Sequence, residues 1–200
     1  MGPDGADPAV RIAYPTDLDH IAELFARAFQ SDPAFVYLFP DAARRARRLP
    51  RFFRLVLGDP GAVVLMTAGG EAATVWKPAA AQAGGGTLDM LRHLVPMVRV
   101  FGRATPRAMR VGGAIGEHFP AAPHWYLYIA GCDPAHQGSG HGGAAIRAGL
   151  AHAGGAAAYL ETAKEANLGL YQRLGFRVTD RWDVPKGGPR FWSMWRDAET

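Results

Sequence analysis

The sequence predicts a single domain of mixed α/β class over residues 1–200, with residues 1–8 expected to be disordered. Two hundred residues suit one domain. A composition that is 48% hydrophobic and 20% charged can bury a full core. Strand-like and helix-like patterns alternate along the chain, which is typical of this class. No internal repeat and no low-complexity linker divides the sequence.

The chain begins with a predicted strand at 9–14 and a helix at 18–29, whose apolar residues recur at helical spacing. Thr16 and Asp19 resemble a capping box for this helix, with Asp in place of the usual Glu or Gln. A short turn-bounded segment follows at 32–41, and an arginine-rich helix comes after it.

Two strands with a pair of glycines between them are predicted at 62–68 and 71–78, as in a hairpin. A loop at 81–86 leads into a helical stretch at 87–118 that two prolines interrupt. The rest of the chain alternates regularly. Its predicted elements are a strand at 124–132, a helix at 138–153, a strand at 156–162, a helix at 165–175 and closing strands at 176–184 and 190–195.

The net charge is +4, and much of the excess lies in the segment 43–54. Arg44, Arg47, Arg48 and Arg51 recur there on one helical face, opposite apolar residues. This pattern is typical of the solvated face of an amphipathic helix. A contact for phosphate or nucleic acid is the alternative. Because no aromatic residue interleaves with the arginines, as a single-strand platform requires, we expect no nucleic-acid partner.

No apolar run reaches the length of a membrane span, and no stretch has the pattern of a signal peptide. We therefore expect a cytoplasmic protein with no membrane partner, either a monomer or a homodimer. Cys132 is the only cysteine. A single cysteine excludes an internal disulfide and a cysteine-based metal cluster, and we expect no metal.

The segment "CDPAHQGSGHGG" (132–143) lies between a strong predicted strand and a helix start. Successive backbone N–H groups at a helix N-terminus, with no Cβ in the way, form a cradle for an anion. A phosphate-bearing ligand is therefore the leading inference. A nucleoside triphosphate is disfavoured because the lysine of a P-loop is missing.

A dinucleotide is the second possible ligand. Gly138, Gly140 and Gly143 have the spacing G-x-G-x-x-G, and Glu161 ends the next strand about 20 residues on, which suits a ribose-binding acid. Two observations count against it. Several residues separate the strand from the first glycine, and too little chain follows Glu161 for a second nucleotide-binding half.

Coenzyme A is the third, and here two segments carry a resemblance to a known family. "DPAHQGSGHGG" resembles motif A of the GNAT superfamily of acetyl-CoA-dependent acyltransferases, with Gln137, Gly140 and Gly142 at the family's positions. "ETAKEANLGLYQRLGF" resembles motif B, with Asn167 and Tyr171 in place. The start of the chain, "VRIAYPTDLDHIAELFARAF", is similar to the first strand and helix of the family.

The resemblance implies the GNAT fold, of α+β type, with a mixed, mostly antiparallel sheet of six to seven strands flanked by helices. It implies that the strand 124–132 splays from the strand 156–162 and that acetyl-CoA, as co-substrate, lies in the gap. The implied cofactor-binding residues are Ala130, Gly131, Cys132, Gln137, Gly138, Ser139, Gly140, His141, Gly142, Gly143, Asn167 and Tyr171.

The resemblance also assigns Tyr171 as the proton donor to the leaving thiolate. The base that takes a proton from the amine is open between Glu161 and His124. Each of these two residues also has a purely structural alternative, because Glu161 can form a local hydrogen bond and His124 can cap its strand. Cys132 is interpreted as a packing residue, since no acid–base relay is recognisable beside it.

Five side chains are candidates for the acceptor pocket. Asp32 suits a cationic acceptor or, alternatively, a turn with the proline after it. Tyr126 and Tyr128 point to one face of the predicted strand 124–132 and line the acceptor site or, alternatively, belong to the core. Tyr37 and Trp76 are further candidates, so the set is Asp32, Tyr37, Trp76, Tyr126 and Tyr128.

The sequence thus predicts an N-acetyltransferase that transfers the acetyl group of acetyl-CoA to a primary amine of a small, antibiotic-like molecule, by direct attack in a ternary complex. Two alternatives remain. One is an NAD-dependent oxidoreductase that uses the glycine loop. The other is a non-catalytic module that binds coenzyme A or nucleic acid.

Overall fold

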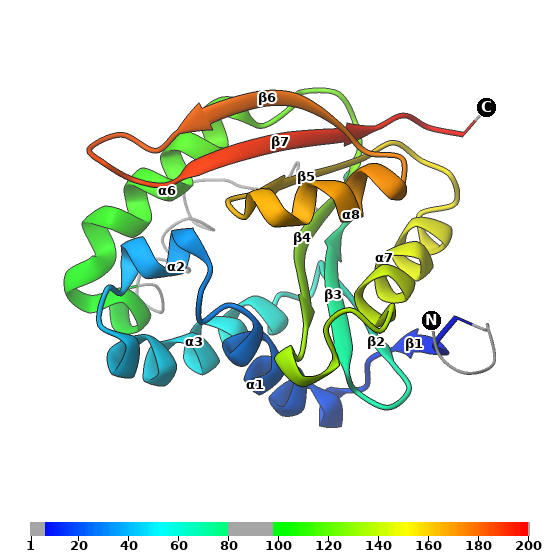
Figure 1. Cartoon of the computed structure of the whole chain (residues 1–200), viewed down its shortest axis with the longest axis horizontal. Coiled ribbons are helices and arrows are strands. Elements are labelled where there is room, and N and C mark those ends of the chain that lie inside the picture. Colours follow the sequence, from blue (N-terminus) through cyan, green and yellow to red (C-terminus); the bar gives the residue numbers. More distant parts are fainter. Residues whose placement is uncertain (1–6, 80–97, 200) are drawn as a thin grey trace.

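The computed structural model describes residues 7–79 and 98–199, and a seven-stranded sheet runs through it (Figure 1). The predicted loop at 81–86 and the helical stretch up to residue 97 lie outside the described residues. The strands follow the order β1-β2-β3-β4-β5-β7-β6. They are β1 (Val10–Ile12), β2 (Val63–Thr67), β3 (Ala72–Lys77), β4 (Trp125–Cys132), β5 (Ala158–Thr162), β6 (Arg177–Asp183) and β7 (Arg190–Arg196).

Every strand pair except one is antiparallel. The exception is β4–β5, which are parallel and paired only at Trp125↔Ala158 and Tyr126↔Tyr159. Beyond these two pairs the strands separate, as Figure 1 shows. The C-terminal half of β4 therefore has a backbone edge that faces β5 without a ladder, and the splayed pair and the mixed, mostly antiparallel sheet expected from the sequence are confirmed.

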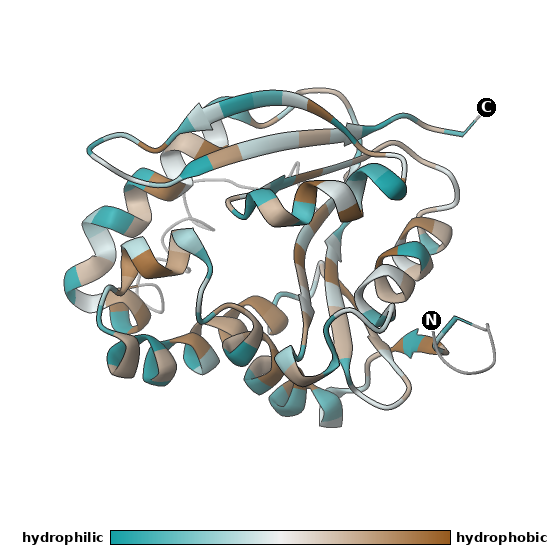
Figure 2. Ribbon diagram, in the orientation of Figure 1, coloured by the Kyte–Doolittle hydropathy of each residue, from teal (hydrophilic) through white to brown (hydrophobic). Residues whose placement is uncertain are grey.

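Helices cover both faces of the sheet, and the strands supply alternate side chains to each face. One face carries a large apolar cluster under α1 (Leu18–Ala28), α2 (Pro33–Leu38), α3 (Ala42–Leu57) and α6 (Thr105–His118). The other carries a smaller cluster under α7 (His141–His152) and α8 (Leu168–Arg173). The apolar side of α1 and α3 points inward and the polar side outward (Figure 2).

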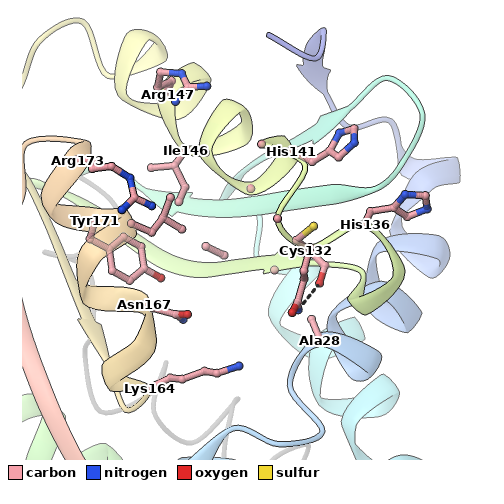
Figure 3. A pocket seen from close by; sticks show the side chains of 18 of the residues that line it. Ala28, Cys132, His136, His141, Ile146, Arg147, Lys164, Asn167, Tyr171 and Arg173 are labelled. Carbon is pink, nitrogen blue, oxygen red and sulfur yellow. Dashed lines mark hydrogen bonds between the residues drawn. The ribbon is translucent and has the colours of Figure 1, made fainter. Parts of the chain in front are cut away.

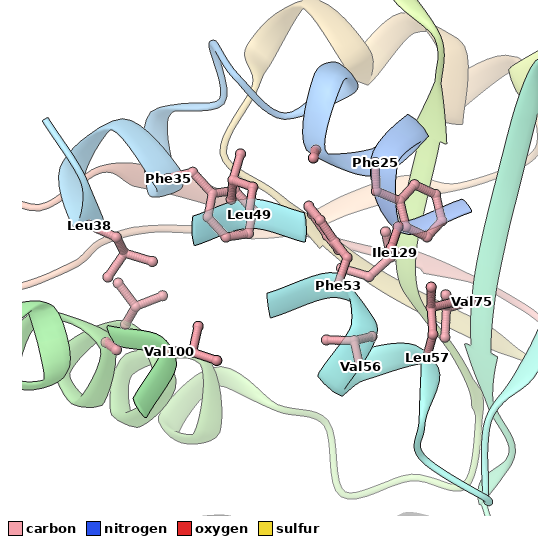
Figure 4. Packing of buried hydrophobic residues seen from close by; sticks show 14 of the residues in the cluster. Phe25, Phe35, Leu38, Leu49, Phe53, Val56, Leu57, Val75, Val100 and Ile129 are labelled. Carbon is pink, nitrogen blue, oxygen red and sulfur yellow. The ribbon is translucent and has the colours of Figure 1, made fainter. Parts of the chain in front are cut away.

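Three phenylalanine rings connect the helices of the larger cluster (Figure 4). Phe53 of α3 lies 5.3 Å from Phe25 of α1 and 5.6 Å from Phe35 of α2, between ring centroids. All three side chains are buried, so the rings fasten three helices to one another. The buried Arg45 adds polar links, because its Nη1 donates to the Phe39 carbonyl at 2.6 Å.

Several element boundaries differ from the sequence-based expectation. The segment 32–41 contains helix α2, because the Asp32 carboxylate accepts the N–H groups of Ala34 and Phe35 and so caps a first turn. The expected capping box of Thr16 and Asp19 is wrong. Asp17 takes that place, and its carboxylate accepts the Tyr14 N–H at 2.7 Å.

Two predicted helices begin later than expected. The helix expected at 138–153 begins at His141, after a short 3-10 turn, η3 (Pro134–His136). The helix expected at 165–175 divides into a 3-10 turn, η4 (Glu165–Asn167), and α8. A further 3-10 turn, η2 (Gly102–Ala104), leads into α6.

The expectation of disorder at residues 1–8 falls largely outside the described residues. Asp7, however, is placed, and its carboxylate accepts from Arg147 on α7 at 2.8 and 2.5 Å. Within the described ranges, no helix combines the length and the apolarity that crossing a bilayer needs.

Candidate active site

The glycine-rich loop is held in place by charged side chains before the glycines begin. Arg27 of α1 donates two hydrogen bonds to the Asp133 carboxylate, at 2.8 and 2.6 Å. The other carboxylate oxygen accepts the Ala135 N–H at 3.0 Å and starts η3. The residues that separate the strand from the first glycine thus form a fixed turn that delivers the loop to the start of α7.

The glycines then form an open backbone cradle. Gly138 and Gly140 have φ of +83° and +88°, a region that favours glycine. A Cβ added at either position would meet nothing within 4 Å, so the space in front of the loop is open. Gly140 is also the N-cap of α7, whose first N–H groups point out of the helix end. This arrangement suits a phosphate group.

A cavity of about 450 Å³ lies against this cradle (Figure 3). Of the twelve cofactor-binding residues implied by the family resemblance, all but Ser139 line it. His141 does so with a half-buried side chain, whose buried Nδ1 lies 3.7 Å from the Glu71 carboxylate. Gln137 anchors the loop, since its side-chain amide donates to the Cys132 carbonyl at 3.3 Å.

The floor of this cavity is the unpaired edge of β4. On one side, Ala130, Gly131 and Cys132 pair with β3, while the side toward β5 has no ladder. Gly131 is required by packing, because a Cβ there would lie 2.6 Å from the Phe25 ring of α1. A pantetheine arm fits such an edge, because its amides can pair with exposed backbone groups as an added strand does.

Three basic side chains around the cavity were missed by sequence reasoning. Arg147, Lys164 and Arg173 line it together with the cradle, and Figure 3 shows Arg147 on α7 and Arg173 on α8. Arginine and lysine are the usual partners of phosphate groups. Of these three, only Arg147 could have been expected at the cavity from the sequence, because it lies one helical turn after the motif A glycines. The residues present therefore fit coenzyme A.

A second cavity, of about 210 Å³, adjoins the cofactor cavity. Its walls are mainly apolar and come from α2, α3, α6 and the strands, and include Phe35, Leu38, Phe52, Phe101 and Val111. Five residues line both cavities and define the junction between them: Phe29, Asp32, Ala130, Asn167 and Tyr171.

Glu161 is the most unusual group of the second cavity. The Tyr126 hydroxyl donates to Oε1, whereas Oε2 is buried and has no hydrogen bond among the residues that the structure describes. Burial raises the pKa of Glu161 to about 7, and the bond from Tyr126 opposes that rise. A buried carboxylate oxygen with an open lone pair, beside a cavity, is set to receive an N–H donor or a proton.

Tyr171 lies at the junction, with its ring packed edge-on to Phe176 and its hydroxyl toward the cavity (Figure 3). Burial raises the pKa of Tyr171 to about 12; the nearby charge of Asp32 adds to this, and a hydrogen bond with Asn167 opposes it. The phenol is therefore fully protonated at neutral pH and available as a donor.

Asp32 has two roles that the sequence treated as alternatives. Its carboxylate caps α2, with the Ala34 N–H at 2.9 Å, and it also lines both cavities. Burial raises the pKa of Asp32, while two backbone N–H groups and Lys164 lower it. The capping therefore places a carboxylate where the two cavities meet.

The other predicted site residues divide into three groups. Tyr128 lines the second cavity as expected. Tyr126 does not line the second cavity, but its hydroxyl donates a hydrogen bond to Glu161, which does. His124, Trp76 and Tyr37 line neither cavity.

Each of the three residues outside the cavities has a structural place. His124 is buried between the rings of Phe119, Tyr159 and Trp195, away from the junction. Trp76 is fully buried where α7 crosses β3, and a Cβ on Gly149 would lie 2.1 Å from its indole nitrogen. Tyr37 receives a hydrogen bond from Arg110 on its hydroxyl at 3.1 Å.

Cys132 lines the cofactor cavity, but its surroundings do not favour a nucleophile. Burial raises the pKa of the Cys132 thiol, and the Asp133 carboxylate adds to this, so the reactive thiolate is disfavoured. The part of the chain that the structure covers contains no group of three or more potential metal ligands from His, Cys, Asp and Glu.

Comparisons with known proteins agree with this geometry. Residues 102–176 match the model of the acetyltransferase (GNAT) family. A crystal structure described as histone acetyltransferase HPA2 and related acetyltransferase, from Corynebacterium glutamicum, matches with a TM-score of 0.73 at 25% identity, over 98% of each chain.

Two animal enzymes share the fold at lower identity. Arylalkylamine N-acetyltransferase 2 from Aedes aegypti has a TM-score of 0.61 at 10% identity, over 97% of this chain and 100% of that one. Polyamine N-acetyltransferase from Drosophila melanogaster has a TM-score of 0.53 at 17% identity, over 96% and 100%.

The protein has the fold of the GNAT acetyltransferases. The segment 102–176, which contains the glycine loop, β5 and Tyr171, matches that family in sequence as well. GNAT proteins use acetyl-CoA, and the family and fold support an acyltransferase.

Proposed function

We propose that this protein transfers the acetyl group of acetyl-CoA to a primary amine of a small molecule. The observation that carries the proposal is the junction of the two cavities. The phosphate cradle and the open edge of β4 lie on one side of it, and the unsatisfied carboxylate oxygen of Glu161 lies on the other. An amine bonded to that oxygen would approach a thioester laid along β4.

The residues at the junction divide the proton transfers between them. Bound acetyl-CoA supplies a thioester, in which the carbon–sulfur bond breaks as the amine nitrogen bonds to the carbonyl carbon. Glu161 takes the proton that the ammonium must lose before attack. Backbone N–H groups at the end of β4 stabilise negative charge on the carbonyl oxygen. Tyr171 donates a hydrogen bond and then a proton to the leaving sulfur.

The acceptor should have an apolar body. The second cavity is lined mainly by aromatic and aliphatic side chains, and its carboxylates Asp32 and Glu161 lie at or near the junction. An amine with an apolar group can therefore place its charge beside these carboxylates and bury the rest. Several segments of the chain, including "HWYLYIAGCDPAHQGSG" and "VPKGGPRFWSM", resemble puromycin N-acetyltransferase, so puromycin is the first acceptor to try.

A dinucleotide is disfavoured by the placement of the acidic residue. The G-x-G-x-x-G reading needs Glu161 beside the glycine loop, to bond a ribose. Glu161 instead lines the second cavity and does not line the one against the glycines. The glycine loop and Glu161 therefore serve different ligands in this proposal.

Acetyl-CoA is expected to raise the melting temperature of the protein, and NAD is not. A ligand at 100 times its Kd adds about 2.7 kcal/mol to the free energy of unfolding, which is roughly 5–10 °C for a chain of this size. Gly142→Val should abolish the shift, since Gly142 lines the cradle and a Cβ there would meet only Cys132, at 3.8 Å.

Gly113→Val is the matched control for this thermal-shift experiment. It makes the same change within a helix, at a position in α6 where a Cβ meets nothing within 4 Å. It should keep the acetyl-CoA shift. A shift caused by NAD alone, or an undiminished shift in Gly142→Val, would contradict the assignment of the cradle.

Asp32→Asn should raise the KM for a cationic acceptor by roughly 10–100-fold, because a hydrogen bond to a charged group contributes about 1.5–3 kcal/mol. Asn is as good an N-cap as Asp, so helix α2 should persist. Asp41→Asn is the control, since Asp41 caps α3 in the same way but lines neither cavity of the junction. Steady-state kinetics at saturating acetyl-CoA would measure both. Equal KM values in the two variants would remove Asp32 from amine recognition.

A further inference from the structure

Seven arginines line one groove on the side of the molecule away from the cofactor. The groove, of about 1080 Å³, lies between the first half of α3 and the segment formed by η2 and α6. Its arginines are Arg44, Arg47, Arg48, Arg51, Arg103, Arg107 and Arg110, and Asp41 is the one acidic residue among the described residues that line it. The whole chain has a net charge of only +4, so this groove accounts for more than the entire excess.

The charge of the groove is not neutralised by the described residues. Asp41 accepts the backbone N–H of Arg44 at 2.7 Å, so it serves as a helix cap. In the described ranges, none of the seven guanidinium groups forms an ion pair with a carboxylate. Elsewhere on the chain, arginines such as Arg54 and Arg190 do pair with carboxylates.

Three of the seven guanidinium groups are held by neutral partners, which fix their position but leave their charge. Arg48 donates to the carbonyls of Arg99 and Val100 at 2.7 and 2.6 Å. Arg107 and Arg110 donate to the Tyr37 carbonyl and hydroxyl, at 3.3 and 3.1 Å. The remaining four, Arg44, Arg47, Arg51 and Arg103, are exposed. Fixed guanidinium groups beside exposed ones form a surface that can bind an anion.

The density of charge favours nucleic acid over an acidic peptide. From Arg44 to Arg51, helix α3 rises about 10 Å. Over that length a DNA duplex carries about six phosphates, at one per about 1.7 Å of its axis. An extended peptide with a carboxylate on every residue would offer about three. Seven arginines from the two sides of one groove match the denser polyanion, and the arginine fork bonds phosphate in bidentate fashion.

Among the residues that the structure describes, the groove also has no exposed aromatic side chain on which bases could stack. Phe39 and Phe101, the two aromatic residues that line it, are almost fully buried. Stacking aromatic residues are what single-strand binding requires, and their absence from the arginine face led to the sequence-based expectation of no nucleic-acid partner. A duplex presents only its backbone to such a groove and needs no stacking. We therefore propose that this arginine groove binds the phosphate backbone of a nucleic-acid duplex, without sequence preference.

The test uses a 20-base-pair DNA duplex and fluorescence anisotropy from 50 to 200 mM salt. The wild-type chain should bind, with affinity that falls steeply as salt rises. The variant Arg44→Gln/Arg47→Gln/Arg51→Gln removes three exposed arginines and retains good helix formers. Loss of three phosphate contacts should make the negative slope of log K against log salt shallower by about 2.7. It should also weaken binding at 50 mM salt on the order of a hundredfold or more.

A matched control separates the groove from net charge alone. Arg177→Gln/Arg181→Gln/Arg190→Gln removes the same charge from β6 and β7, at the far edge of the sheet, and should bind the duplex like wild type. Equal losses in both variants, or no binding at 50 mM salt, would overturn the proposal. Tighter binding of polyglutamate than of duplex would also overturn it, in favour of an acidic protein partner. Circular dichroism and the acetyl-CoA shift verify that both variants are folded.

Discussion

Glu161→Gln is expected to lower kcat/KM for the acceptor amine by roughly 10²–10⁴-fold, the usual contribution of a general base. Gln has nearly the same shape and can still accept the Tyr126 hydroxyl bond, but it cannot take a proton. The cofactor cavity does not include Glu161, so the affinity for acetyl-CoA should be unchanged. Thiol release at saturating acetyl-CoA measures the first quantity, and isothermal titration measures the second.

The pH dependence gives this prediction a second, independent readout. Glu161 acts as a base only when it is ionised, so kcat/KM should rise with pH through about 7, the value to which burial raises its pKa. The Tyr126 hydroxyl stabilises the ionised form. Tyr126→Phe should therefore move this limb to higher pH, and Glu161→Gln should remove it. A profile that is identical in all three proteins would show that another group is the base.

The same carboxylate should cost stability at high pH. Its pKa is about 7 in the folded protein, against an ordinary value of 4.5, so folding favours the protonated form. This contribution to the free energy of unfolding is fully present below about pH 4.5 and is lost as the pH rises through about 7. Glu161→Gln should thus be more stable than wild type above pH 8, by about 3 kcal/mol, and similar to it near pH 4. Urea unfolding at the two pH values would show the difference.

The parts of the fold that follow a local pattern could be predicted from the sequence. The hairpin at β2–β3 follows from two adjacent glycines between apolar runs, and the strand before the glycine loop from its aromatic alternation. Helix α2 could not be predicted from hydrophobic period, because it is only six residues long and depends on the Asp32 cap. The burial of Arg45 could not be predicted either, because only the fold brings to it the carbonyls of Gln30 and Phe39 that accept its hydrogen bonds.

The candidate site shows the same division. The glycine loop is continuous in the sequence, so its glycines predict an open backbone turn at the start of a helix, which Gly138 and Gly140 form. The acceptor cavity is assembled from α2, α3, α6 and three strands, and no local spacing reports such contacts. Trp76 and His124 were plausible as site aromatic and base because strand alternation gives two faces but does not say which one meets the cavity. Trp76 faces α7 instead.

Tyr171→Phe is expected to keep the affinity for acetyl-CoA and to lower kcat by roughly 10²–10⁴-fold, as the loss of a positioned general acid does. The change removes one hydroxyl and leaves the ring, whose edge-on packing against Phe176 should persist. Because the pKa of Tyr171 is raised to about 12, the phenol stays protonated over the usual assay range, so no titration of this group should enter the pH profile. The variant should therefore retain the limb near pH 7 that Glu161 produces, at a lower plateau.

Tyr159→Phe is the matched control for the loss of a buried hydroxyl. Tyr159 is equally buried, its hydroxyl bonds the Ser193 hydroxyl at 3.0 Å, and it lines neither cavity. Its loss should cost about 1 kcal/mol of stability with little change in rate. Turnover and melting temperature, measured together, separate the two roles. If Tyr171→Phe behaved like the control, with wild-type turnover and only a lower melting temperature, Tyr171 would be a packing residue, and the leaving sulfur would take its proton from water.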